Sequence, residues 1–203
     1  MKSFIFDIDG TLLDTEAMYM TSLQAILHER GIEKSYAELA TTFGIPSKDA
    51  LLRLKIPAWE DVLALWGPRT QDYRDTVAIY AGVTAALADL KARGAQLAIM
   101  TSKRQFEYDR DVVSLGLDQY FSQAIVAEDV ANGKPAPDGI LLAMQRLGST
   151  SADTVYVGDT IYDQEAAHAA GVAFGFAAWN GKRPDDLQPD VSFLTPAAML
   201  KLL

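Results

Sequence analysis

The 203-residue chain contains no cysteine and only two histidines, His28 and His168. The absence of cysteine excludes disulfides, a thiolate zinc site and a thiol nucleophile. Two histidines are too few for a metal site built from histidine alone. Lysine and arginine are also sparse, since 18 of them face 27 acidic residues, a formal net charge of −9, and they form no dense run. Nucleic acid is therefore not expected as a partner, because contact with phosphate backbones needs clustered positive charge. Any chemistry must rely on oxygen atoms and lysine.

Long hydrophobic runs are missing as well. The apolar stretch at residues 4–6 ends at Asp7 and Asp9 and is too short for a signal peptide or a membrane-spanning helix. We therefore expect no membrane association and a cytoplasmic location. A composition of 49% apolar and 22% charged residues is typical of a soluble globular protein, and the length suits one domain or a domain with a sizeable insertion. The sequence gives no indication of the oligomeric state.

Helical and strand patterns alternate after Gly82. This alternation predicts crossover units and a doubly wound, mostly parallel α/β sheet, with its ligand site at the carboxyl ends of the strands. The predicted strands are residues 4–6, 96–100, 123–126, 154–157 and 172–176, with a possible edge strand at 191–194. The predicted helices of this region are residues 83–92, 105–115, 137–147, 162–170 and 196–203.

Residues 16–79 interrupt this regular alternation. Their apolar residues recur at helical intervals and are broken repeatedly by glycine and proline, which predicts short helices only. We interpret the segment as an all-helical cap inserted into an α/β catalytic core of residues 1–15 and 80–203, with hinges at residues 14–17 and 78–82.

Polar residues follow the predicted strands, and the ends of parallel strands share one edge of a sheet. These residues are Asp7, Asp9, Thr101, Ser102, Lys134, Asp159 and Asp163. Crowded carboxylates need compensating positive charge, and an all-oxygen ligand set favours a hard cation, Mg²⁺ in particular. Four carboxylates, one lysine and Mg²⁺ leave a net charge of about −1, which one protonated aspartate brings close to neutral. The pattern therefore favours a phosphate site.

The segments around these residues resemble, in order, the four motifs of the haloacid dehalogenase-like hydrolases. Residues 6–15 read FDIDGTLLDT, Thr101-Ser102 follows as the second motif, residues 134–137 read KPAP, and residues 158–163 read GDTIYD. One such motif alone means little, but four in order, each after a predicted strand, are highly specific. The resemblance spans the whole chain, and the helical insertion stands where that superfamily carries its first type of cap.

The resemblance implies a role for each residue. Asp7 is implied to be the nucleophile that forms an aspartyl-phosphate, and Asp9 the general acid toward the leaving alcohol and the general base for water. Lys134 is implied to pair with the nucleophile and the phosphate. Gly10 allows a tight turn beside the phosphate, and the segment at Thr101 and Ser102 is implied to bind the substrate through the Thr101 hydroxyl and nearby backbone N–H groups.

The resemblance also implies how the metal and the substrate are held. Asp7, the backbone carbonyl of Asp9, and Asp159 are implied to ligate Mg²⁺, with Asp163 close by or bound through water. A cap loop such as residues 43–48 commonly faces the site in this superfamily, which makes Lys48 a candidate for substrate specificity, although such lysines more often lie on a solvated helix face.

Asp9 argues against dehalogenation, because displacing a halide needs no proton donor. We therefore predict a Mg²⁺-dependent phosphatase acting on a small phosphorylated metabolite, a phosphate monoester that is phosphoglycolate-like or nucleotide-like. The nearest alternative is a sugar-phosphate mutase of the β-phosphoglucomutase type. An alternative from another class is a phospho-accepting, receiver-like signalling module, which also combines carboxylates, Mg²⁺, threonine and lysine on a parallel sheet. The helical insertion after the first strand argues against the receiver.

Overall fold

A computed structural model describes residues 1–182, 184 and 186–203 of the chain. The chain forms two compact units, one made of Met1–Leu13 and Ile79–Leu203 and the other of Asp14–Ala78, which we name the α/β unit and the helical unit. The short strands β2 (Leu13–Asp14) and β3 (Ala78–Ile79) form a two-stranded sheet and contain the two points where the chain passes between the units. The sequence pattern predicted neither of these strands.

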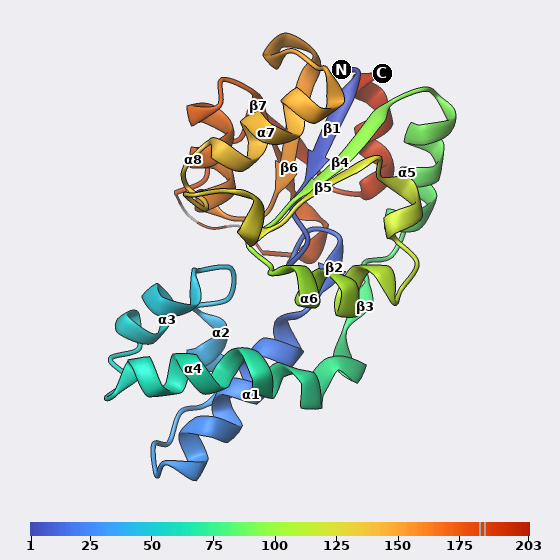
Figure 1. The fold of residues 1–203 in the computed structure, drawn as a ribbon. Helices are drawn as coiled ribbons and strands as arrows, with labels where there is room; N and C mark the ends of the chain where they lie inside the picture. Colours follow the sequence, from blue (N-terminus) through green and yellow to red (C-terminus); the bar gives the residue numbers. More distant parts are fainter. Residues whose placement is uncertain (183, 185) are drawn as a thin grey trace. The chain divides into compact units, whose positions relative to one another are not determined.

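The α/β unit is built on a six-stranded parallel sheet with the order β5-β4-β1-β6-β7-β8 (Figure 1). The strands are β1 (Ser3–Phe6), β4 (Gln96–Met100), β5 (Gln123–Ile125), β6 (Thr154–Gly158), β7 (Ala173–Ala177) and β8 (Val191–Phe193). Strand β1 is buried along its whole length, as expected for a central strand covered on both faces. The predicted doubly wound parallel α/β fold is confirmed.

Helices cover both faces of this sheet (Figure 1). Helices α7 (Asp138–Leu147) and α8 (Ile161–Ala169) lie on one face, and α5 (Val83–Ala92) lies on the other with the C-terminal 3₁₀ helix Pro196–Leu202. Alternate strand residues such as Ile5, Ala98 and Tyr156 belong to one hydrophobic cluster with Ile140 of α7 and Ala166 of α8. This period of two follows from the pleat of each strand, which turns successive side chains to opposite faces.

Two of the predicted helices differ in type from the observed ones. The helix predicted over residues 105–115 begins as α6 (Gln105–Tyr108) and continues as a π-helical segment, Asp109–Val113. The helix predicted over residues 196–203 is a 3₁₀ helix. A hydrophobic period near three to four residues does not distinguish these helix types over so few turns.

The helical unit contains α1 (Glu16–Glu29), α2 (Tyr36–Ala40), α3 (Ser47–Arg53), α4 (Trp59–Arg69) and the 3₁₀ helix Thr70–Thr76. Leu23 and Leu27 of α1 share a buried cluster with Leu51 of α3 and Trp66 of α4, so the short helices stabilise one another through one small core. The indole N–H of Trp66 donates a hydrogen bond to the carbonyl oxygen of Tyr19 at 3.0 Å. Among the described residues, no helix combines the length and the apolar character that crossing a membrane requires.

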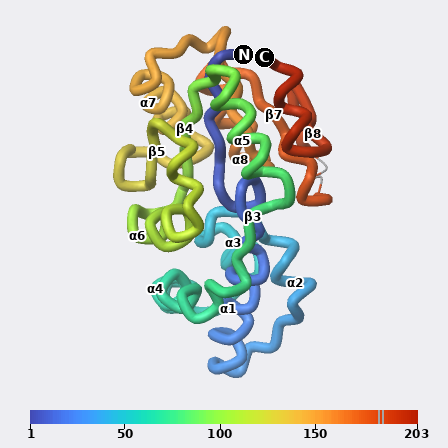
Figure 2. Tube along the Cα trace, turned by 90° about the vertical axis from the view of Figure 1, so that its right-hand side faces the viewer, coloured from blue at the N-terminus to red at the C-terminus, as the bar shows by residue number. Residues whose placement is uncertain are grey.

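The two ends of the chain lie side by side (Figure 2). The amino group of Met1 donates a hydrogen bond to the carbonyl oxygen of Leu202. Strand β1 pairs with β4 and β6 from the later part of the sequence, and Asp7, just after β1, lies beside Lys134, which is more than a hundred positions away.

Candidate active site

The turn after β1 places Asp7 at the carboxyl end of the central strand. The backbone carbonyl of Ile8 accepts hydrogen bonds from the N–H groups of Leu12 and Leu13 at 2.8 and 2.9 Å, which folds the chain back at once. Gly10 has a φ of +77°, and a Cβ atom there would lie 2.1 Å from Oδ2 of Asp159. Only glycine allows the two turns to approach so closely.

Asp159 follows β6 directly and is held by two side chains from other turns. Its Oδ1 accepts a hydrogen bond from the Thr11 hydroxyl at 3.3 Å, and its Oδ2 accepts one from the Asn180 amide at 3.2 Å. The same Asn180 amide group donates to the backbone carbonyl of Gly10 at 3.0 Å. Asn180 therefore fixes the Asp159 carboxylate against the turn that follows Asp7.

Asp163 belongs to the first turn of α8, where it forms a capping box with Thr160. Its Oδ2 accepts hydrogen bonds from the backbone N–H groups of Asp159 and Thr160 and from the Thr160 hydroxyl, at 3.2, 3.0 and 2.6 Å. Its Oδ1 accepts from Lys134 at 2.7 Å and from the Tyr156 hydroxyl at 3.1 Å. Both carboxylate oxygens of Asp163 thus have protein partners.

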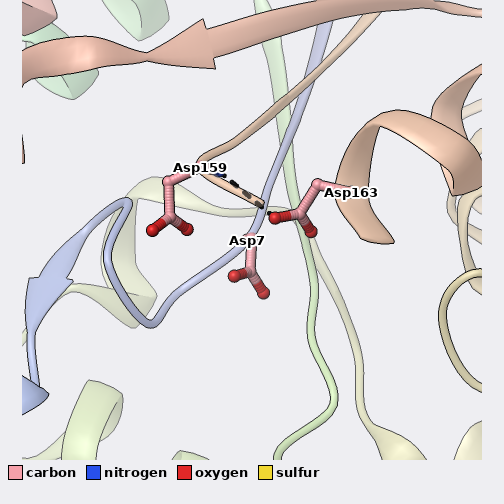
Figure 3. Close-up of side chains that lie close together, drawn as sticks. All are labelled: Asp7, Asp159 and Asp163. Atoms are coloured by element: carbon pink, nitrogen blue, oxygen red, sulfur yellow. Dashed lines mark hydrogen bonds between the residues drawn. The ribbon is translucent and has the colours of Figure 1, made fainter. Parts of the chain in front are cut away.

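Lys134 connects two of the carboxylates. Its Nζ lies 2.8 Å from Oδ1 of Asp7 and 2.7 Å from Oδ1 of Asp163, and all three side chains are buried. Oxygens of Asp7, Asp159 and Asp163 lie within 4.8 Å of one another. Figure 3 shows the three carboxylates, with Asp7 from the turn after β1, Asp159 from the turn after β6 and Asp163 from the start of α8. We name Asp7, Asp159, Asp163 and Lys134 the carboxylate cluster.

The charges of the carboxylate cluster are unbalanced. Burial raises the pKa of Asp7 to about 7, with Lys134 opposing the shift and Asp163 adding to it. Burial, together with the charges of Asp163 and Asp7, raises the pKa of Asp159 well above its usual range. Burial also disfavours ionised Asp163, but Lys134 and the Thr160 hydrogen bonds outweigh it and lower the pKa of Asp163. One lysine therefore compensates one carboxylate and leaves two that resist ionisation.

A divalent metal ion fits this donor set. The three acidic residues supply only oxygen ligands, which suit hard cations, and they lie close enough to share one ion. Burial is the main cause of the raised pKa values of Asp7 and Asp159, and the positive charge of a divalent cation would favour their ionised forms. Asp7 and Asp159 are the two candidates for direct ligation, because Asp163 already accepts five hydrogen bonds, one of them from the Lys134 ammonium group, whereas Asp159 accepts only two from neutral side chains.

Asp9 lies outside the carboxylate cluster. Its Oδ1 is 2.9 Å from Nζ of Lys103, and that ammonium group is 2.8 Å from Oδ2 of Asp111. Arg110 pairs with both oxygens of Asp111, with Nη2 at 2.7 Å from Oδ2. Burial disfavours ionised Asp111, but the hydrogen bond from Arg110 and the charge of Lys103 outweigh it and lower the pKa of Asp111.

The other residues singled out from the sequence lie in different settings. Thr101 is buried just after β4, where its hydroxyl accepts a hydrogen bond from the Lys103 N–H at 3.2 Å, whereas Ser102 is exposed. Lys48 belongs to the helical unit and lies in α3, not in the expected loop, because that helix begins at Ser47. Its Nζ is 5.5 Å from the centre of the Trp59 ring. Every candidate residue except Lys48 belongs to the α/β unit.

Several residues that shape the site were not assigned these contacts from the sequence. Lys103 and Asp111 pair with Asp9 and with each other, and Tyr156 holds Asp163 from within β6. Asn180, from the segment after β7, anchors Asp159. The position of Lys103, directly after the second motif and two residues beyond Thr101, is the one sequence signal that could have drawn attention to it.

The parallel α/β sheet, the helical insertion and the acidic cluster at the strand ends agree with the family that the four sequence motifs resemble. A profile of the family "Haloacid dehalogenase-like hydrolase" matches residues 4–177. The chain belongs to this family of hydrolases.

Individual relatives are similar over nearly the whole chain. A proposed pyrophosphatase PpaX from Caldanaerobacter subterraneus is 32% identical over 89% of this chain and 83% of its own length. A phosphoglycolate phosphatase from Aquifex aeolicus is 27% identical over 100% of this chain and 97% of its own. A crystal structure of a proposed phosphoglycolate phosphatase from Lactobacillus plantarum is 27% identical, with a TM-score of 0.92, covering 100% of this chain and 99% of that one.

Proposed function

We propose that the protein is a Mg²⁺-dependent phosphatase that hydrolyses a small phosphate monoester through an aspartyl-phosphate on Asp7. The observation that carries this proposal is the separation of two neighbouring aspartates into different surroundings. Asp7 lies in the carboxylate cluster, with Lys134 Nζ at 2.8 Å, whereas Asp9 faces Lys103 at 2.9 Å. Neighbouring acids placed in different environments are suited to different tasks in one reaction.

In the proposed reaction, an oxygen of Asp7 attacks phosphorus and the bond from phosphorus to the alcohol oxygen breaks. Asp9 gives its proton to that leaving oxygen and later takes a proton from the water that attacks the aspartyl-phosphate. The second attack releases inorganic phosphate and restores Asp7. Two moderate steps thereby replace one difficult displacement.

The remaining residues hold the reactants. Lys134 orients Asp7 and contributes positive charge beside the transferring group, and the buried Thr101 hydroxyl is positioned after β4 to bind phosphoryl oxygens. Asp7, Asp159 and the backbone carbonyl of Asp9 would hold Mg²⁺, with Asp163 positioning Lys134 and the Asp159 backbone. When bound, Mg²⁺ supplies positive charge that favours the ionised carboxylates and stabilises charge on the phosphoryl oxygens.

Residues 16–79 serve in this proposal as the cap that selects the substrate, and Lys48 is its candidate contact for a second anionic group. The names of the relatives support a phosphoglycolate-like or pyrophosphate substrate. Replacing Lys48 with alanine should then raise the KM for phosphoglycolate more than the KM for phenyl phosphate, which lacks the second anionic group.

The decisive experiment measures phosphate release from phosphoglycolate, pyrophosphate, nucleoside monophosphates and p-nitrophenyl phosphate, with Mg²⁺ and with EDTA. We expect repeated turnover only with Mg²⁺ and a loss of at least about 1,000-fold in Asp7→Asn, which removes the nucleophile. Asp89→Asn, on the exposed surface of α5, is the matched control and should keep full activity. Retained turnover in Asp7→Asn contradicts the assigned nucleophile.

The same assays separate the two alternatives. A sugar-phosphate mutase converts a hexose 1-phosphate into its isomer without net phosphate release. A receiver-like module takes up about one equivalent of phosphate from a small donor and then stops. Continuous release of inorganic phosphate from one substrate therefore excludes both.

A further inference from the structure

Lys103 is a buried lysine outside the carboxylate cluster. The residue is 3% exposed, and its ammonium group lies 2.9 Å from Oδ1 of Asp9 and 2.8 Å from Oδ2 of Asp111. Burying an ammonium group is costly unless anionic partners compensate it. Asp111 supplies such an anion, and an oxygen of the Asp9 carboxyl group accepts a second contact from the ammonium group, so the Lys103 side chain is fixed by two directed contacts.

Asp111 does not need Lys103 for its own charge balance. Arg110 already pairs with both Asp111 oxygens, Nε with Oδ1 and Nη2 with Oδ2, which is the bidentate geometry that suits a carboxylate. Since Arg110 already balances the charge of Asp111, the positive charge of Lys103 is available to its second partner, Asp9. Asp111 acts as an anchor that keeps the ammonium group in place.

The anchor has an unusual backbone. Arg110 and Asp111 belong to the π-helical segment Asp109–Val113, and π-helical turns are rare and occur frequently at functional sites. The Asp111 side chain is 1% exposed and its position is determined by packing as well as by its ion pairs. Buried Asp111 therefore gives the Lys103 ammonium group a fixed partner.

Asp9, in contrast, lies in a turn, with 23% of its side chain exposed. Several staggered rotamers are open to a partly exposed aspartate, and only some of them aim the carboxylate at a reacting atom. A misplacement of about 1 Å can cost roughly 100-fold in rate.

We propose that Lys103 is a positioning residue that holds the Asp9 carboxylate in the orientation needed for proton transfer, with Asp111 as its anchor. This inference rests on the proposed function of Asp9. Lys103 directly follows Thr101 and Ser102, so the segment that begins with the second motif would both bind phosphate and position Asp9. Lys103 touches neither the substrate nor the reacting atoms in this scheme and acts through Asp9.

The test compares two substrates that differ in their need for a proton donor. Phenyl phosphate releases a basic phenolate that needs protonation, whereas 2,4-dinitrophenyl phosphate releases a stable anion that does not. The ratio kcat/KM includes only the steps up to departure of the alcohol, so it isolates the donation of the proton by Asp9. Turnover by the unmodified protein and its loss in Asp7→Asn establish the proposed function first.

We expect Lys103→Met to lower kcat/KM for phenyl phosphate by roughly 10- to 100-fold, part of the whole contribution of a general acid. The value for 2,4-dinitrophenyl phosphate should change by less than about threefold, because its departure needs no proton. In an Asp9→Asn background, Lys103→Met should cause no further loss for phenyl phosphate, because a residue acting only through Asp9 has nothing left to position. Lys91→Met, an exposed lysine that donates to the Gln119 carbonyl, is the matched control and should leave both values unchanged.

Equal losses on both substrates, or additive losses in the double variant, would overturn the proposal. Circular dichroism and thermal melting of each variant establish that it is folded. If Lys103→Met does not fold, Lys103→Arg replaces it, because arginine keeps the positive charge but has a longer and planar end group. A lysine that only balances charge is rescued by arginine, whereas a positioning lysine shows the same selective loss for phenyl phosphate.

Discussion

The α/β unit contains two groups of charged side chains that differ in their balance of acids and bases. The carboxylate cluster has three acids and one lysine, namely Asp7, Asp159, Asp163 and Lys134. The second group, which we name the Lys103 cluster, has two acids and two bases, namely Asp9, Asp111, Lys103 and Arg110. The carboxylate cluster therefore has two more acids than bases, whereas the Lys103 cluster has equal numbers of both.

The pKa shifts follow from this difference. In the carboxylate cluster, burial raises the pKa values of Asp7 and Asp159, and a single lysine is too little to oppose it for both. In the Lys103 cluster, burial acts on Asp111 in the same direction, but Arg110 and Lys103 outweigh it and lower its pKa. A buried acid is therefore a sign of cation binding only where the protein leaves its charge uncompensated.

The largest difference between the two clusters is expected when one carboxylate in each is exchanged for an amide. Asp159→Asn removes a candidate metal ligand, and we expect Mg²⁺ affinity to fall more than about 100-fold. The same change should leave the metal-free protein about as stable, because a carboxyl that resists ionisation becomes a neutral amide of similar shape. Calorimetric titration with Mg²⁺ and urea unfolding in EDTA measure the two effects.

Asp111→Asn should give the opposite result and serves as the matched exchange. It leaves Lys103 and Arg110 without their common anion, and breaking a buried pair costs about 3 kcal/mol in free energy of unfolding. Mg²⁺ affinity should stay within about threefold, because no candidate ligand is lost. If both variants lose metal affinity equally, the two clusters form one electrostatic unit and the distinction drawn here is wrong.

Asn180 tests whether the support of a ligand matters as well as the ligand. Its amide donates to Asp159 Oδ2 at 3.2 Å and to the Gly10 carbonyl at 3.0 Å. We expect Asn180→Ala to weaken Mg²⁺ binding by about 10- to 100-fold, as is usual when a residue that orients a ligand is lost. Asn132→Ala is the control, because Asn132 also donates to an aspartate, the exposed Asp138, at 3.0 Å. Unchanged affinity in Asn180→Ala argues that Asp159 is held by the Thr11 hydroxyl alone.

The parts of the site that could be predicted are those determined by topology. Asp7 and Asp159 follow β1 and β6, which pair directly in the sheet, so their proximity follows once the strands are recognised. Lys134 was expected beside Asp7 from the family motif, and the structure places it there. The hydrogen bonds of Asp163 follow from a local pattern, because a threonine three residues before an acid at a helix start favours a capping box.

The parts that could not be predicted depend on burial and on contacts between distant segments. A lysine in a polar turn normally remains solvated, but Lys103 is buried and pairs with Asp111 of the π-helical segment. Asn180 reaches Asp159 from the turn after β7, a contact across separate loops that no periodic pattern records. Sequence reasoning therefore placed the carboxylates of the carboxylate cluster together, but it missed the contacts made by Lys103 and Asn180.

A change of pH should lower Mg²⁺ affinity less than Asn180→Ala does. In the metal-free protein the pKa of Asp7 is raised from 3.8 to about 7, so the folded state holds this proton where the unfolded state has lost it. The contribution of Asp7 to metal-free stability is therefore fully present below about pH 4 and is lost as pH rises toward about 7.

The stability that bound Mg²⁺ adds should instead increase with pH, because Asp7 must lose its proton to act as a ligand. We expect Mg²⁺ affinity to fall somewhat less than tenfold from pH 7.5 to pH 6, so the gain in Tm from added Mg²⁺ is smaller at the lower pH. Differential scanning calorimetry with Mg²⁺ and with EDTA at each pH measures this gain. A gain that stays constant across the range shows that Asp7 is already ionised without metal, which means that Lys134 balances it and that the carboxylate cluster resembles the Lys103 cluster after all.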